Sequence, residues 1–148
     1  MIGVMAVNHY AKDPSSIYST LDCDILLRRD PTNLQRALQA LLQDGRNLMA
    51  LGEPLGKPDR FICRRIVECG GMVTAVKPGE MPIDIVLGIE GMRFSVLKKR
   101  RRIFTVAGVR VPCADLQDIL LAKERAGRGK DLAFLKLYGA NLHKLGMK

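Results

Sequence analysis

Two acidic residues, Asp22 and Asp24, lie one residue apart in the stretch Ser19–Leu27, which alternates short polar and apolar residues and ends in Ile-Leu-Leu. This period of two predicts a half-buried strand. The residues expected to face the core are Cys23, Ile25 and Leu27. The two carboxylates would project from the opposite face, about 6.6 Å apart along the strand. Adjacent carboxylates repel unless a cation lies between them, and hard oxygen ligands suit Mg²⁺ or Mn²⁺. The alternative is an exposed edge strand whose acids prevent pairing with other chains.

A third carboxylate, Asp84, lies inside the otherwise apolar stretch Pro82–Gly88, which is expected to be a strand. An uncompensated charge among apolar residues is costly. A cation shared with Asp22 and Asp24 would compensate it. Asp84 therefore favours the metal-site interpretation over the edge-strand interpretation.

The composition is that of a globular protein, and at 148 residues it predicts one domain over residues 1–148. Lys plus Arg (24) minus Asp plus Glu (15) gives a net charge of +9, which favours polyanionic partners. The chain has three Tyr, four Phe and no Trp, which argues against the base-stacking platforms of single-strand-binding proteins.

The cysteines have no metal-ligand spacing, and with only His9 and His143 beside them they predict no zinc site. The four are Cys23, Cys63, Cys69 and Cys113. We expect reduced thiols, a cytoplasmic location and no membrane association, because no apolar run approaches about 18 residues and the N-terminus lacks the features of a signal peptide.

The elements that would hold the acids can be placed along the first half of the chain. Residues 2–7 predict a short buried helix or strand. Asp30 as N-cap, Pro31 and apolar residues at helical spacing predict a helix that ends at Gly45. At least the second half of residues 46–60 reads as a loop. Residues 61–67 and 72–76 predict two strands joined by a hairpin turn at 68–71.

The second half combines positive charge with two short strands and two helices. Lys98–Arg102 is a run of five positive charges, interpreted either as a solvated connection or as a patch that steers phosphate-rich ligands. We expect strands over 103–106 and 109–112, and a helix over 114–126 that carries Lys123 on its buried face. That lysine either extends to solvent or reaches a carboxylate or a phosphate.

The end of the chain predicts a last helix over 132–138, with Asp131 near its N-terminus, and a frayed tail over 139–148.

The order of these features resembles the DNA polymerase beta-like nucleotidyltransferase superfamily, and in particular its small prokaryotic branch of AbiEii-type toxins and uncharacterised relatives. The features are a glycine among small residues, T-x-D-x-D on a strand, a third Asp on a later strand, and K-x(4)-R-x-K-D near the end. The matching residues are Gly3, Thr20, Asp22, Asp24, Asp84, Lys123, Arg128, Lys130 and Asp131.

The resemblance implies an α/β (α+β) fold with a short mixed sheet flanked by helices. It implies catalysis and metal binding by Asp22, Asp24 and Asp84 with Mg²⁺ or Mn²⁺, and transfer of a nucleotide from a nucleoside triphosphate to a hydroxyl of RNA, such as tRNA, or of a protein. The implied nucleotide-binding residues are Gly3, Thr20, Lys123, Arg128 and Lys130. A toxin–antitoxin or phage-defence role, with a cognate antitoxin protein as partner, is implied as well.

The chain departs from this pattern at Gly3-Val4, where the family has Gly-Gly or Gly-Ser, and in the absence of the helix that normally precedes this glycine. The family pattern therefore implies a shortened N-terminus or an internal start. The departure and the charge of +9 keep a second function class open, a non-catalytic module that binds nucleic acid or a partner protein through its basic surface.

Overall fold

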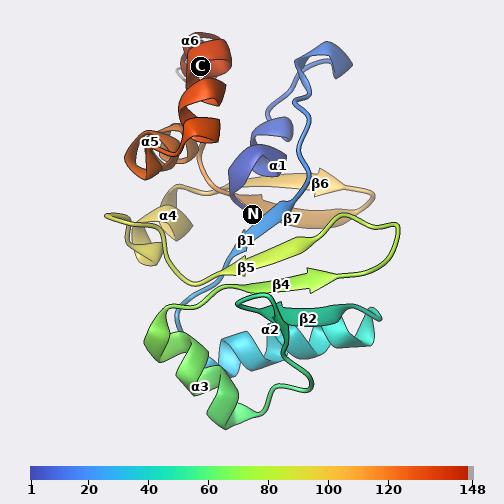
Figure 1. The fold of residues 1–148 in the computed structure, drawn as a ribbon. Helices are drawn as coiled ribbons and strands as arrows, with labels where there is room; N and C mark the ends of the chain where they lie inside the picture. The colour runs from blue at the N-terminus through green and yellow to red at the C-terminus, as the bar shows by residue number, and fades with distance from the viewer. Residues whose placement is uncertain (147–148) are drawn as a thin grey trace. The chain divides into compact units, whose positions relative to one another are not determined.

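The computed structural model describes residues 1–146, which form six α-helices, a five-stranded sheet and a two-stranded sheet (Figure 1). This mixed α/β architecture, with a mixed five-stranded sheet, confirms the predicted α+β fold class. The chain divides into two compact units. The central unit is Thr20–Gly88, and the terminal unit combines Met1–Ser19 with the chain from Ile89 onward. The expectation of a single domain over residues 1–148 stays a prediction.

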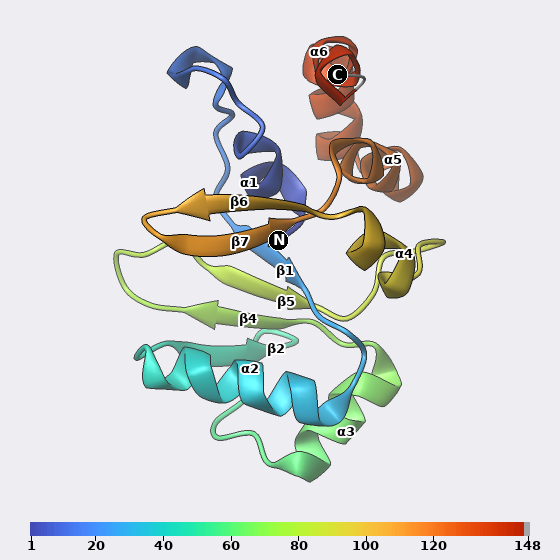
Figure 2. The ribbon, with the colours of Figure 1, turned by 180° about the vertical axis from the view of Figure 1, so that it is seen from behind.

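The central unit is built on the five-stranded sheet, with strand order β1-β5-β4-β2-β3. Its strands are β1 (Cys23–Leu26), β2 (Asn47–Ala50), β3 (Glu53–Pro54), β4 (Val73–Val76) and β5 (Ile83–Val86). β1 and β5 are parallel, and the other neighbouring pairs are antiparallel. The helices α2 (Pro31–Gln43) and α3 (Arg60–Cys69) pack against each other and lie on the same side of this sheet (Figures 1 and 2).

Burial of apolar side chains between these two helices and the sheet forms the core of the central unit. The buried residues are Leu34, Leu38, Leu48, Cys63, Val73, Ala75, Ile85 and Leu87. The helix predicted from Asp30 and Pro31 is confirmed as α2, whose first turn is capped by the Asp30 carboxylate accepting a hydrogen bond from the Asn33 N–H. In residues 46–60 the β2–β3 hairpin occupies residues 47–54, and residues 55–59 form the loop expected in the second half.

The strand predicted over 61–67 is wrong, because this segment is the helix α3. The Asp59 carboxylate accepts a hydrogen bond from the Ile62 N–H and caps its first turn. The residues of α3 that pack into the core recur at helical spacing: Cys63, Ile66 and Val67. Gly70 then ends the helix in the left-handed conformation, at φ 66°, so the expected hairpin turn is a helix C-cap followed by β4.

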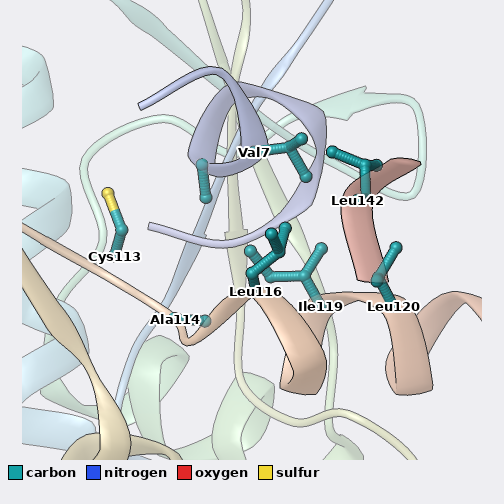
Figure 3. Close-up of a cluster of buried hydrophobic side chains, with 8 residues drawn as sticks. Val7, Cys113, Ala114, Leu116, Ile119, Leu120 and Leu142 are labelled. Carbon is teal, nitrogen blue, oxygen red and sulfur yellow. The ribbon is translucent and has the colours of Figure 1, made fainter. Parts of the chain in front are cut away.

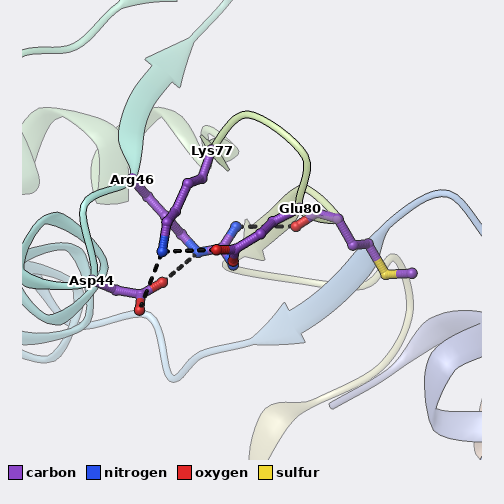
Figure 4. A network of polar contacts seen from close by, with 5 residues as sticks. Asp44, Arg46, Lys77 and Glu80 are labelled. Atoms are coloured by element: carbon purple, nitrogen blue, oxygen red, sulfur yellow. Dashed lines mark hydrogen bonds and ion pairs between the residues drawn. The ribbon is translucent and has the colours of Figure 1, made fainter.

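A buried arginine joins the end of α2 to the β4–β5 connection (Figure 4). The Arg46 guanidinium donates to Asp44 Oδ2 at 2.9 Å, to Glu80 Oε2 at 2.6 Å and to the Met81 carbonyl at 3.0 Å. Lys77 Nζ pairs with Glu80 Oε1 at 2.7 Å. Because Arg46 is buried and donates to three acceptors, this network fixes one end of the sheet.

The terminal unit contains a helix pair, a β-hairpin and three short helical segments. Its elements are α1 (Gly3–Asn8), a 3₁₀ turn (Pro14–Ser16), α4 (Phe94–Arg100), β6 (Arg102–Val106), β7 (Val109–Cys113), α5 (Leu116–Ala126) and α6 (Gly129–Gly146). Figure 3 shows its core, in which Val7 of α1 and Leu142 of α6 lie close to the buried face of α5. The buried residues are Ala6, Val7, Cys113, Ala114, Leu116, Ile119, Leu120 and Leu142.

The predicted frayed tail is wrong over residues 139–146, because α6 continues to Gly146 and buries Leu142. Residues 147–148 lie outside the described part of the chain. The strands predicted over 103–106 and 109–112 and the helix over 114–126 are confirmed to within two residues as β6, β7 and α5. Over the residues described, none of the helices is sufficiently long and apolar to cross a membrane.

Candidate active site

The sheet register brings two of the predicted catalytic carboxylates side by side. Asp24 of β1 and Asp84 of β5 are directly paired in the parallel ladder, with their strands about 4.8 Å apart. The residues that follow them, Ile25 and Ile85, face the core beneath α2 and α3. Since side chains alternate along a strand, Asp24 and Asp84 project from the face that those helices leave uncovered.

Two threonine hydroxyls orient carboxylates at this face. Thr74 of β4, which pairs with Asp84 in the antiparallel register, donates from Oγ1 to Asp84 Oδ1 at 2.6 Å. Thr20, predicted to bind nucleotide, donates from Oγ1 to Asp22 Oδ1 at 3.0 Å. Asp22 lies two residues before Asp24, immediately outside β1. The sequence analysis missed Thr74, because nothing in the chain fixes which residue of β4 faces Asp84.

The three carboxylates do not form a preformed metal site. Within residues 1–146, no three side chains from His, Cys, Asp and Glu are positioned to hold a metal ion. The donor chemistry of the pair nevertheless fits Mg²⁺, because this ion is usually held by one or two carboxylates together with substrate phosphates and water. Metal binding by Asp22, Asp24 and Asp84 stays a prediction.

The thiol of Cys23, next to these acids in β1, is a poor nucleophile. Burial, the largest influence on this thiol, raises its pKa. A thiol that stays protonated at neutral pH neither attacks an electrophile nor binds a metal as thiolate. Cys23 is therefore not a candidate nucleophile or thiolate ligand.

The terminal unit places Lys123 and Arg128 around a single buried carboxylate, that of Asp131. Lys123 Nζ lies 2.8 Å from Asp131 Oδ1, and Arg128 Nε lies 2.6 Å from Asp131 Oδ2. The Asp131 side chain is 0% exposed and that of Lys123 is 13% exposed. Lys123 Nζ also lies 4.8 Å from the centre of the Phe134 ring, a cation–π contact. Of the two partners predicted for this lysine, the structure contains the carboxylate.

The charge of Asp131 is maintained by these two donors. Burial alone would raise the pKa of its carboxyl, but the hydrogen bonds from Lys123 and Arg128 and their positive charges outweigh burial and hold the pKa below its usual range. Asp131 is thus the centre of a buried ion network that joins the end of α5 to the start of α6. The sequence signal for it was the lysine on the buried face of α5.

The remaining predicted nucleotide contacts also belong to the terminal unit. Lys130 is exposed in the first turn of α6, and Gly3 begins α1 with φ 70°, a left-handed conformation that favours glycine. The site residues therefore divide between the two units, with Thr20 and the three aspartates in the central unit and Gly3, Lys123, Arg128 and Lys130 in the terminal unit.

The basic run Lys98–Arg102 has in part a structural role. Arg100 Nη1 lies 3.2 Å from Asp118 Oδ1, and Arg102 Nε lies 3.7 Å from Asp115 Oδ2, both acids belonging to the first turn of α5 or its cap. Lys98 and Lys99, in the last turn of α4, are exposed. The ion pairs of the arginines support the interpretation as a structural connection. The exposed lysines are compatible with the interpretation as a patch that steers phosphate-rich ligands.

Comparison of this chain with protein-family models, with curated proteins and with solved structures found no match.

Proposed function

We propose that this protein is a metal-dependent nucleotidyltransferase that transfers a nucleoside monophosphate from a nucleoside triphosphate to a hydroxyl of RNA or protein, in a toxin–antitoxin or phage-defence setting. The observation that supports it best is the register pairing of Asp24 with Asp84 on the face of the sheet that α2 and α3 leave uncovered. Two like charges directly opposite each other on neighbouring strands repel, and a shared cation would remove that repulsion.

Asp24 and Asp84 are the residues that would hold Mg²⁺ or Mn²⁺, and Asp22, two residues earlier in the chain, is the third predicted ligand. Such ions, when bound, neutralise developing phosphate charge and activate the attacking oxygen. The chain itself supplies orientation: Thr74 fixes the Asp84 carboxylate through a 2.6 Å hydrogen bond, and Thr20 holds that of Asp22. Preorganised donors and ligands of this kind lower a barrier because they need no rearrangement during reaction.

The test is transfer of label from each of the four α-labelled nucleoside triphosphates to RNA and to protein, with Mg²⁺ or Mn²⁺. Asp24→Asn and Asp84→Asn should each lower transfer by at least about 100-fold, the scale expected when a transition-state charge contact is lost. Asp13→Asn, which removes an exposed carboxylate of the terminal unit, is the matched control and should retain activity. Mn²⁺ binding, followed by electron paramagnetic resonance, should weaken in the same two variants.

Absence of transfer from every nucleotide, or full activity in both asparagine variants, would refute the enzymatic proposal.

The alternative is a non-catalytic module that binds nucleic acid or a partner protein through its basic surface. The observation that favours it is that Lys123 and Arg128, two expected phosphate contacts, are engaged by Asp131. It predicts nucleic-acid binding that is steeply dependent on salt and unchanged in Asp24→Asn and Asp84→Asn. Binding that disappears with the acids would argue against this alternative.

A further inference from the structure

The exposed face of α3 combines three arginines with one aromatic ring. Arg60, Phe61, Arg64 and Arg65 are all exposed, and Phe61 is 69% exposed. Spacings of three and four residues place Phe61 beside Arg64 and Arg65 on the surface of the helix. We call these four residues the α3 surface. The sequence analysis missed it because it predicted a strand here, which would have placed alternate members of this set on opposite faces.

Folding of the central unit does not explain the α3 surface. The inward half of α3 supplies the packing, through Cys63, which is fully buried, and the apolar residues around it. Arg60 is the first residue of the helix, where the helix dipole disfavours positive charge, and the only acid there is the N-cap Asp59, which accepts from the Ile62 N–H. Arg65 is 3.5 Å from Glu68, an exposed pair that contributes little to stability and can exchange for a phosphate.

We propose that the α3 surface binds a single-stranded nucleic acid, with Arg60, Arg64 and Arg65 contacting phosphates and Phe61 stacking on one base. Charge complementarity selects a polyanion, and arginine pairs with phosphate oxygens in a bidentate fashion. An exposed ring among arginines selects an unpaired base, because bases inside a duplex have no free face. The scarcity of aromatic residues excludes an extended stacking platform, but a single ring needs only one base.

This inference rests on the proposed function in one respect: the nucleic acid bound at the α3 surface would be the acceptor of the transferred nucleotide. The binding is independent of transfer chemistry. It is therefore measured in EDTA without nucleotide, so that a failure of the transferase proposal leaves this result unaffected and the reverse also holds.

The first experiment measures binding of the full chain to a fluorescent 12-nucleotide adenine RNA, and to its DNA counterpart, across salt concentrations. Each phosphate contact on a single strand contributes about −0.7 to the slope of log K against log salt, so Arg60→Gln/Arg64→Gln/Arg65→Gln should reduce the slope by about 2. Comparison of the RNA probe with the DNA probe shows which of the two nucleic acids the α3 surface prefers.

The matched control removes the same charge elsewhere, with Lys12→Gln/Arg110→Gln/Lys136→Gln, three exposed residues of the terminal unit. Both triple variants lower the formal charge from +9 to +6, since 9 − 3 = 6. We expect at least tenfold weaker binding for the α3 variant and less than threefold for the control. Equal weakening of the two, or loss only in the control, would overturn the assignment to α3.

The second experiment isolates the ring with Phe61→Leu, which keeps an apolar side chain and removes stacking. Loss of one base stack should weaken RNA binding by about 5- to 140-fold, from 1–3 kcal/mol at 1.4 kcal/mol per tenfold. Binding to heparin, a polyanion without bases, should not change. Unchanged RNA affinity, or equal losses on RNA and heparin, would refute stacking by Phe61. Circular dichroism verifies that each variant is folded, which the exposure of these side chains leads us to expect.

Discussion

Replacement of Asp131 by asparagine should destabilise the terminal unit strongly at neutral pH. The substitution leaves the Lys123 ammonium, 13% exposed, without its 2.8 Å carboxylate partner. Breaking a buried pair by removing one partner costs about 3–5 kcal/mol, mostly because a desolvated charge remains. Arg128, at 63% exposed, retains access to water, so Arg128→Ala should cost about 1 kcal/mol or less.

Tyrosine fluorescence gives an assay specific to this unit. The chain has no Trp, and its three tyrosines, Tyr10, Tyr18 and Tyr138, all belong to the terminal unit. Urea unfolding monitored at the tyrosine emission therefore reports the terminal unit, whereas far-ultraviolet circular dichroism reports both units. Asp131→Asn should shift the tyrosine transition and leave the part of the dichroism signal that comes from the central unit unchanged.

A double-mutant cycle separates a structural lysine from a ligand-binding one. If Lys123 serves mainly to neutralise Asp131, Lys123→Met should also cost about 3 kcal/mol, and Lys123→Met/Asp131→Leu should be more stable than either single variant. The reasoning is refuted if Lys123→Met leaves the tyrosine transition within about 0.5 kcal/mol of wild type and abolishes nucleoside triphosphate binding, or if the two single costs simply add.

The pH dependence of the same variants tests the sign of the effect. The pKa of Asp131 is lowered in the folded state, so its contribution to stability is present above the unfolded value of about 3.9 and is lost as the pH falls through the lower folded value. The difference in unfolding free energy between wild type and Asp131→Asn should therefore be larger at pH 7 than at pH 3. An equal difference at both pH values would show that the carboxylate charge is not responsible.

Three further perturbations test the central unit. Arg46→Met should lower the unfolding free energy by about 2 kcal/mol by urea titration, because it leaves the Met81 carbonyl without its donor. Leu51→Asn should stabilise by about 0.5 kcal/mol, seen as a small rise in the thermal midpoint that Leu51→Ala does not reproduce, because Leu51 is 99% exposed and has φ 53°, which asparagine tolerates better than leucine or alanine does. Asp84→Asn, which keeps an acceptor for the Thr74 hydroxyl, should be at least as stable as wild type in EDTA and should lose the rise in thermal midpoint that Mg²⁺ gives to wild type.

Local signals in the sequence predicted the elements that they control. Asp30 and Pro31 specify the start of α2, and alternation around Asp24 specifies β1, because capping and side-chain periodicity act within a few residues. The prediction failed over 61–67, where a short apolar run fits a strand or a helix equally well. There the capping residues favour the helix, with Asp59 as its N-cap and Gly70 as its left-handed C-cap. The sequence analysis had assigned Gly70-Gly71 to a hairpin turn and had not considered Asp59 as an N-cap.

The candidate site was predictable in its residue types but not in its pairings. Asp24 and Asp84 are separated by 60 positions, and only the parallel register of β1 and β5 makes them neighbours. The hydrogen bond from Thr74 depends on the same register, from the other side of β5. Lys123 could be expected to reach some anion, but that the anion is Asp131 depends on the angle at which α6 leaves α5, which follows from tertiary packing.

Two features determine how the proposed transferase would neutralise the charge of a triphosphate. Lys123 is paired with Asp131, and Asp84 is a proposed cation ligand. Because the Asp131 network engages Lys123 and Arg128, the charge that neutralises a triphosphate in the proposed transferase would come from the cations held by the aspartates. Nucleotide affinity should then be low without Mg²⁺ and should depend strongly on it. A non-catalytic module has no such dependence, because phosphates bound by arginines alone bind better when Mg²⁺ does not compete for them. The direction in which Mg²⁺ changes nucleotide affinity therefore separates the two functions before any acceptor is known.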